Sequence, residues 1–515
     1  MIRRTLSMVT AWIVICAFSS ATVQAQLLGH SIGISFTGNS LSDPTQPGLA
    51  PPDTNGAVGL NHYVEFTNGA YAVHDKSTGA IVGSRVTDVT FWNNSGISAA
   101  ITNTGVSDTR IIFDKLSQRW FAAEITLSST GNLVLVAVSK TSNPLDGFNA
   151  TSYVGSAQFA DYPVLGVNAD GVTISTNNFT SSVGSFSGIS VTTIPKADLL
   201  AVTPSVANKT TFNNPSASLG FTIQGVTSID PSIGHTALVA VNNSNFSQLN
   251  RTNINGVIGA GASLSATNIV NVAATSYTGL ARQPDGTRQI DGLDDRIGGT
   301  ASAYQVGGNI FLVHGISVNA AGVAATSGSA THNALRLTVL NEASNAVVTE
   351  STLFSNLYDY IMPSIAVNQF GDIVVGFTRS GSVADGFLSS YADVCNFDGS
   401  SIICDTPFLA GTGTGATGGG LGQANYHLFG GDGERWGDFS ATNVDPNDPY
   451  SFWTAQEFAG TPTRFSGGEW RTQVTQIALT PRISSATPEP GSLALLTGLG
   501  VSGLFAVRGL RRRKK

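Results

Sequence analysis

Units of short β-strand patterns recur along this 515-residue chain, and few architectures can accommodate their spacing. An acidic residue or a proline precedes the first strand pattern of each unit, at Asp53, Asp108, Asp161, Asp295, Pro363 and Asp438. The first two intervals are 55 and 53 residues, and the last two are 68 and 75. The 134-residue interval after Asp161 has room for two units, which predicts a further one near Asp230. We therefore expect seven units.

The pattern within each unit predicts an all-β fold. HYVEFT and AYAVHD, for example, meet at Asn68-Gly69, a strong two-residue hairpin signal. About four short strands repeated at this period predict a single β-propeller of about seven blades, because each blade buries its faces against its neighbours and ring closure removes exposed sheet edges. We assign residues 26–487 to this domain. A β-helix or a pair of β-sandwiches is the structural alternative.

Residues 1–25 are typical of a secretory signal peptide. Arg3 and Arg4 precede an apolar run from Ala11 to Phe18, and Val23-Gln24-Ala25 offers a small-residue cleavage site. Eight of the 26 Lys and Arg residues lie in residues 1–25 and after Pro490, which leaves 18 basic against 33 acidic residues in the body. A body this acidic is a poor partner for nucleic acid or an anionic membrane, and its charge is compatible with cation binding.

Residues 488–515 combine a Pro-Glu-Pro tripeptide, an apolar run from Leu493 to Val507 and a basic terminus. As a helix, the apolar run is about 22 Å long, shorter than a hydrocarbon core of about 30 Å. Basic residues stay on the cytoplasmic side, which predicts export of everything before them. An ordinary C-terminal anchor helix is the alternative interpretation. The residues that carry the pattern are Pro488, Glu489, Pro490, Arg511, Arg512 and Arg513.

This tail resembles the PEP-CTERM sorting signal. The resemblance implies an exosortase as the processing partner and a Gram-negative bacterium that makes extracellular polysaccharide. It also implies that the protein is located at the cell surface, the outer membrane or the extracellular matrix. Contact with a membrane is then expected only through the C-terminal signal.

Two cysteines remain once the signal peptide is removed. Cys395 and Cys404 are nine residues apart in a segment with Gly and Asp. In an exported protein such a pair favours a local disulfide, with two free thiols as the alternative. A zinc site is not favoured, because no His or further Cys lies nearby in the sequence.

The body resembles a family of large secreted bacterial proteins with propeller-like repeats. The resemblance runs from about Pro51 to Ala478 and rests on segments such as SDTRIIFDKLSQRWFAAEI, MPSIAVNQFGDIVVGFTRSG and RWGDFSATNVDPNDPYSFWTAQEF. That family has no settled activity, and labels of sialidase or glycosyl hydrolase attach to it by analogy of fold, which does not fix function. This chain departs from it at Ile297-Gly298 and at Phe439, where the family tends to carry a larger apolar residue and Tyr.

The residues at the blade starts are the candidate site. In a propeller the first strand of each blade lines the central channel, so these side chains can converge on one rim. Such a rim could bind a glycan, whose carboxylates Arg grips bidentately, or Ca²⁺, which takes six to eight oxygens. The alternative is that each Asp caps backbone N–H groups at a blade junction and each Arg braces it. The candidates are Asp108, Arg110, Asp161, Asp295, Arg296, Arg435, Trp436 and Asp438.

Trp436 is singled out because an exposed indole beside charged groups commonly holds a sugar face. No catalytic residue is assigned. A sialidase needs an Arg clamp, a Tyr nucleophile with a Glu and an acid, and the usual Ser-x-Asp-x-Gly-x-Thr-Trp turn of sialidases is absent. Two functions from different classes remain: a non-catalytic propeller that binds extracellular polysaccharide or a surface protein, and a secreted glycan hydrolase. No cofactor is required, and calcium is the one cation we consider.

Overall fold

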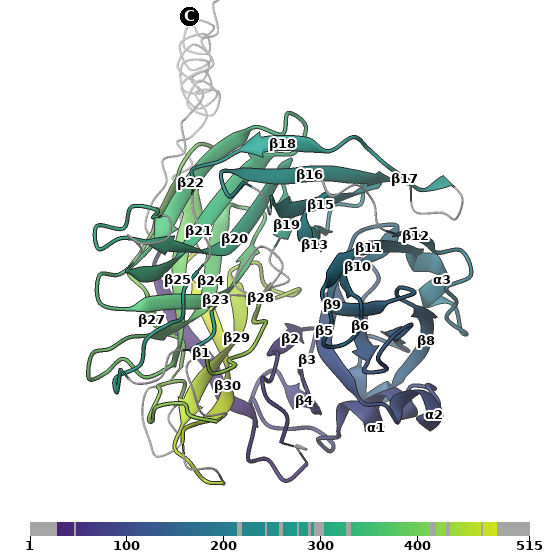
Figure 1. Cartoon of the computed structure of the whole chain (residues 1–515), viewed down its shortest axis with the longest axis horizontal. Coiled ribbons are helices and arrows are strands. Elements are labelled where there is room, and N and C mark those ends of the chain that lie inside the picture. Colours follow the sequence, from purple (N-terminus) through teal and green to yellow (C-terminus); the bar gives the residue numbers. More distant parts are fainter. Residues whose placement is uncertain are drawn as a thin grey trace, which may run out of the picture.

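The computed structural model describes residues 28–481, apart from 46–47, 214–218, 243–244, 257–260, 275–277, 287–289, 293–302, 326–330, 412–418, 429–432 and 465–466. The described strands form seven sheets arranged around a central axis, as Figure 1 shows. The fold is therefore a seven-bladed β-propeller, which confirms the predicted architecture and rules out a β-helix or two sandwiches. We number the sheets as blades 1 to 7 in chain order.

The first three blades are antiparallel meanders that start at the centre and run outward. Blade 1 contains β2 (Asn55–Val58), β3 (His62–Thr67) and β4 (Ala70–Asp75). Blade 2 contains β5 (Val106–Asp114), β6 (Arg119–Thr126), β7 (Leu133–Ser139) and β8 (Phe148–Val154). Blade 3 contains β9 (Phe159–Val167), β10 (Gly171–Phe179), β11 (Phe186–Pro195) and β12 (Thr210–Asn213).

A strand from within the blade 4 segment of the chain joins blade 5. Blade 4 contains β13 (Phe221–Gly225), β15 (His235–Val241), β16 (Gln248–Asn255), β17 (Ser263–Leu264) and β18 (Asn268–Asn271). Blade 5 contains β14 (Thr227–Ser228), β19 (Ala303–Val306), β20 (Asn309–Val318), β21 (His332–Asn341) and β22 (Val347–Leu353). β14 follows β13 in sequence but pairs in parallel with β19. The fourth unit therefore begins at β13, before the position near Asp230 that the spacing predicted.

Blade 6 contains β23 (Asp359–Val367), β24 (Asp372–Ser380), β25 (Ser389–Phe397), β26 (Ile402–Cys404) and β27 (Phe408–Leu409). Blade 7 contains β28 (Ala441–Val444), β29 (Ser451–Gly460), β30 (Glu469–Leu479) and β1 (His30–Ser40). The N-terminal strand β1 pairs antiparallel with the C-terminal strand β30, from His30 opposite Leu479 to Ser40 opposite Arg471. One blade thus joins both ends of the described chain and closes the ring.

Helical turns cover a minor part of the molecule, in keeping with the lack of sustained helical periodicity in the sequence. They are α1 (Asp88–Asn94), α2 (Ala99–Thr102), α3 (Lys196–Leu200) and a 3₁₀ turn at Pro144–Asp146. Figure 1 shows α1 and α2 at the periphery, where α1 contacts β4, the outer strand of three-stranded blade 1. The Thr87 side chain caps α1 by accepting a hydrogen bond from the Thr90 N–H.

The hydrophobic core consists of separate layers, and one layer fills each junction between consecutive blades. Between blades 2 and 3, for example, Phe121 and Val136 pack with Leu165 and Ile174. The layer between blades 7 and 1 includes Trp453. Both faces of a blade are therefore buried, which explains why many strands are apolar along their whole length rather than at alternate residues.

The innermost strands share a local distortion. Asp108, Tyr162, Thr222 and Met362 each have a positive φ, between 47° and 66°, and each lies within a register shift of its blade's first strand pair. Asp53, just before β2, has a φ of 48°. An extra residue inserted in one strand is a β-bulge, which bends the strand and leaves a backbone group unpaired. The blade-start signal in the sequence therefore marks a repeated bulge beside the channel.

Candidate functional site

The innermost strands of blades 1, 2, 3 and 7 enter the channel at the same end. Neighbouring first strands contact one another, β28 with β2, β2 with β5 and β5 with β9. The residues at their beginnings, Asp53, Asp108, Asp161 and Asp438, therefore meet at one opening of the channel, which we call the start end. The structure brings these four carboxyl groups together as the sequence predicted.

Two of the four carboxylates bind backbone groups of the adjacent blade. Asp53 Oδ1 accepts a hydrogen bond from the Asp438 N–H at 3.1 Å, and Asp108 Oδ2 accepts one from the Tyr162 N–H at 2.9 Å. Asn68 bridges blades 1 and 2, since its Nδ2 donates to Asp53 Oδ2 at 2.8 Å and its Oδ1 accepts from the Asp108 N–H at 2.8 Å.

Blade 4 repeats this arrangement with an amide in place of a carboxylate. The Thr222 N–H, in the bulge of β13, donates to Asn177 Oδ1 of blade 3 at 3.0 Å. Each bulge frees a buried N–H, and a buried N–H requires an acceptor. The recurrence of Asp and Asn near the blade starts is therefore explained in part by capping between blades, one of the two interpretations that the sequence left open.

Burial and mutual repulsion shift the acidity of this cluster. Burial raises the pKa of Asp53 well above its usual range, and the neighbouring charges of Asp438 and Asp108 add to the effect. The pKa of Asp161 is raised to about 8, mainly by burial, with contributions from the charge of Asp108 and from a hydrogen bond between the two carboxyl groups. A proton is therefore retained in this cluster at neutral pH.

Two arginines balance the remaining charge. Arg435 Nη2 donates to both carboxylate oxygens of Asp438, at 2.7 and 2.8 Å, and 42% of its side chain is exposed. Arg110 is buried, and its Nε donates to the Pro163 carbonyl of blade 3 at 2.8 Å. Its guanidinium lies 3.3 Å from the centre of the Phe439 ring, and burial lowers its pKa to about 10. Arg110 therefore braces two blades, whereas Arg435 faces solvent.

Trp436 corrects one expectation. Only 1% of it is exposed, its Nε1 donates to Thr378 Oγ1 at 3.3 Å, and its ring meets that of Tyr426 edge to face at 4.8 Å. Trp436 belongs to a buried apolar cluster with Ile361 and Trp470. It is a packing residue and cannot offer an open face to a sugar.

The remaining predicted site residues are placed as follows. Cys395 and Cys404 form a disulfide and lie directly opposite each other on β25 and β26. Asp295 and Arg296 lie outside the described residues, as do the expected signal peptide (1–25) and the sorting segment with Pro488, Glu489, Pro490, Arg511, Arg512 and Arg513. Within the described part of the chain, no helix is long and apolar enough to span a bilayer.

Calcium does not fit the start end as the structure describes it. Oxygens of Asp53 and Asp108 accept backbone N–H groups, and the positive charges of Arg110 and Arg435 lie beside the carboxylates of this cluster. Among described residues, Asp393, Cys395 and Cys404 are the one set whose ligand atoms are close enough to share a metal ion. The two sulfurs of that set are bonded to each other.

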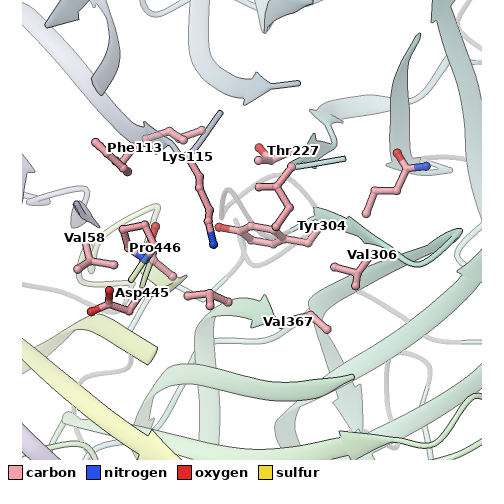
Figure 2. Close-up of a pocket in the computed structure, with 14 residues that line it drawn as sticks. Val58, Phe113, Lys115, Thr227, Tyr304, Val306, Val367, Asp445 and Pro446 are labelled. Carbon is pink, nitrogen blue, oxygen red and sulfur yellow. The ribbon is translucent and has the colours of Figure 1, made fainter. Parts of the chain in front are cut away.

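The opposite opening of the channel, which we call the finish end, holds a cavity that sequence reasoning missed. The first strands of blades 1, 2, 6 and 7 reach it at Val58, Phe113, Val367 and Val444, and Figure 2 shows Lys115 extending across it toward Tyr304. The cavity has a volume of ≈ 80 Å³. No sequence motif marks it, because its lining comes from single residues of several blades.

Comparison with solved structures finds remote similarities. The extracellular domains 1–2 of Drosophila Semaphorin 1b cover 86% of this chain and 86% of their own, with 6% identity and a TM-score of 0.38. A mutant of the Cellvibrio cellulosa α-L-arabinanase covers 69% of this chain and 94% of its own, with 9% identity and a TM-score of 0.32.

An exo-1,5-α-L-arabinanase from a bovine ruminal metagenomic library covers 69% of this chain and 96% of its own, with 10% identity and a TM-score of 0.33. Similarities this remote say nothing about function. No family model and no curated protein matches the sequence.

Proposed function

We propose that this protein is an exported propeller that binds extracellular polysaccharide at the start end of its channel without catalysis. The observation that carries the proposal is the exposed Arg435, held by Asp438 beside the half-buried Asp161. A guanidinium donates hydrogen bonds, and carboxyl groups accept them, so the combination suits the hydroxyl and carboxylate groups of a polysaccharide.

The proposal excludes turnover because the carboxyl groups are engaged elsewhere. Asp53 and Asp108 bind backbone N–H groups of the next blade. Asp108 and Asp161 are hydrogen-bonded to each other, whereas the paired carboxyl groups of glycosidases are about 5 to 9.5 Å apart, with the sugar between them. The arrangement stabilises blade junctions and leaves Arg435 as the main contact for a ligand.

The binding test compares two arginines at opposite ends of the channel. Purified protein is screened by calorimetry against neutral and acidic polysaccharides, as wild type, Arg435→Ala and Arg119→Ala. Arg119 lies at the far end of blade 2 and is only partly exposed, so it serves as the matched control. Loss of a charge-assisted hydrogen bond predicts about tenfold weaker binding for Arg435→Ala alone. Equal affinity of all three proteins would contradict the proposal.

The export part of the proposal rests on the two end segments of the sequence. Replacing Pro488, Glu489 and Pro490 with alanine is expected to leave an uncut precursor held at the membrane. Cell fractionation and intact mass of the protein from its native host measure this. A mature wild-type chain that still ends at Lys515 would contradict it.

A glycan hydrolase is the second candidate, and one observation favours it. The pKa of Asp161, raised to about 8, would keep this carboxyl protonated at neutral pH, as a general acid must be. The same polysaccharide screen, followed for released reducing ends, tests this candidate. Turnover that is abolished by Asp161→Asn or Asp438→Asn would replace the binding proposal with the hydrolase.

A further inference from the structure

The cavity at the finish end presents a hydrogen-bond donor without a described partner. Lys115 is exposed at its opening, and in the described part of the chain it makes no hydrogen bond or ion pair. Gln305 also lines the cavity and is only 3% exposed, yet its Nε2 has no hydrogen-bond partner among described residues. Tyr304 and Val306 of β19 lie around Lys115, whereas Gln305 lies between them on the opposite face of the strand, so the exposed Lys115 ammonium is the donor that favours a ligand accepting hydrogen bonds.

The acidic groups near Lys115 are already paired with other lysines. Asp445, the carboxylic acid of the lining, accepts from Lys76 Nζ at 2.9 Å and from Trp453 Nε1 at 3.1 Å. Asp114, which precedes Lys115 in sequence, is paired with Lys196 at 2.9 Å. The Lys115 ammonium therefore remains available for an anion from outside the protein.

The rest of the lining is mainly apolar. Val58, Val306, Val367 and Ile229 border the cavity, and Figure 2 shows Val58, Val306 and Val367 around the Lys115 side chain. The Tyr304 hydroxyl is in contact with the Thr442 carbonyl at 3.5 Å, and burial raises its pKa to about 12, so it stays neutral. A fully polar ligand such as a sugar acid would lose hydration against these walls without regaining hydrogen bonds.

We propose that the finish end binds a small monocarboxylate with an apolar body. Its carboxylate accepts a hydrogen bond from Lys115, and its aliphatic or aromatic body lies against the valine side chains. Lys115 is exposed, so the ligand reaches the site from solvent without opening a blade junction. The site lies at the other end of the channel from Arg435. The proposed carboxylate binding therefore does not depend on whether the start end binds polysaccharide.

The test uses three probes that share an apolar body and differ in charge. Hexanoate, 1-hexanol and hexylammonium are titrated into the full chain and followed by calorimetry and ligand-observed NMR. Hexanoate is expected to bind at least tenfold more tightly than the alcohol, and the ammonium is expected not to bind. Hexanol binding as tightly as hexanoate, or no saturable hexanoate binding at millimolar concentration, would overturn the proposal.

Substitutions of Lys115 identify the residue. Lys115→Met keeps the apolar stem and removes the charge, and we expect at least a tenfold loss of hexanoate affinity, with recovery in Lys115→Arg. Lys140→Met, at an exposed lysine that follows β7, the third strand of the same blade, is the matched control and should bind like the wild type. Unchanged affinity in Lys115→Met would refute the assignment.

Discussion

The two ends of the channel are built from the same strands and differ in how their charges are used. At the start end, carboxylates and the buried Arg110 are bound to neighbouring blades, so the charged residues there act mainly as structural ties. At the finish end, acids near Lys115 are paired with other lysines and its own ammonium is free of partners among described residues. The carboxylates of the start end therefore serve mainly the fold and leave Arg435 as the group we propose for ligand binding, whereas the finish end offers an ammonium with no described partner.

The largest effect is expected at the buried indole of the start end. Trp436→Ala should lower the free energy of unfolding by about 3 to 5 kcal/mol, because it leaves a cavity in the cluster around Trp470. Urea denaturation measures this, and Trp436→Phe should lose less because it refills part of the space. A cost below about 1 kcal/mol would mean that this end is not held together by packing.

A smaller loss of unfolding free energy is expected when the side-chain hydrogen bonds between blades 1 and 2 are removed. Asn68→Ala leaves the buried Asp108 N–H and Asp53 Oδ2 without their partner, at a cost of about 1 to 3 kcal/mol. Asn61→Ala, at an exposed residue between β2 and β3 whose side chain makes no hydrogen bond in the described part of the chain, is the control in the same denaturation series. If both variants unfold at the same urea concentration, the carboxylates of the start end are not structural.

The retained proton predicts that stability falls as pH rises. An unfolded Asp loses its proton near pH 4, whereas folded Asp161 keeps its proton up to about pH 8, so between these values the folded state binds more protons. Stability is then full below about pH 4 and is lost progressively toward pH 8. Glu457 and Asp393, whose pKa values burial raises to about 8, act in the same direction.

Melting temperatures at pH 5, 6.5 and 8 measure this dependence in the wild type and in Asp161→Asn. The variant is expected to show a shallower decline, since one of the contributing groups no longer titrates. A decline of identical slope in both proteins would show that Asp161 titrates normally and would remove the charge argument for the start end.

The smallest effect is expected at the finish end. Lys115→Met should change the free energy of unfolding by less than about 0.5 kcal/mol, because the residue is exposed and has no described partner to lose. Its effect on hexanoate binding should be far larger than its effect on stability. A loss of stability comparable to that of Asn68→Ala would place Lys115 among the structural residues and erase the contrast between the two ends.

Much of the architecture could be read from the sequence because the bulge repeats. Asp53, Asp108 and Asp161 are spaced by the length of a blade, and the same local geometry recurs at or next to each of them. The number of units was right, but the start of the fourth unit was misplaced. There Thr222, rather than an acidic residue, occupies the bulge, and β14 pairs with the next blade. Neither feature has a signature in residue type.

The candidate site was harder to predict, because exposure depends on contacts between distant segments. Trp436 lies between charged residues in sequence, yet the chain turns its ring inward against Tyr426 and Thr378 of blade 6. The finish-end cavity combines Lys115 with Gln305 and Asp445, which are far apart in sequence and join only when the ring has closed. Residue type and spacing along the chain do not indicate such contacts.

Closure through β1 and β30 also sets an order of events during synthesis. Among the described strands, β1 comes first in the sequence, and its partner, residues 469–479, is the strand made last. Until then the β1 edge is unpaired, and blade 1 lacks the neighbour that covers Tyr63 with Trp453. Earlier blades can form and stack as they are made, but the ring as a whole is completed only after translation of the last strand.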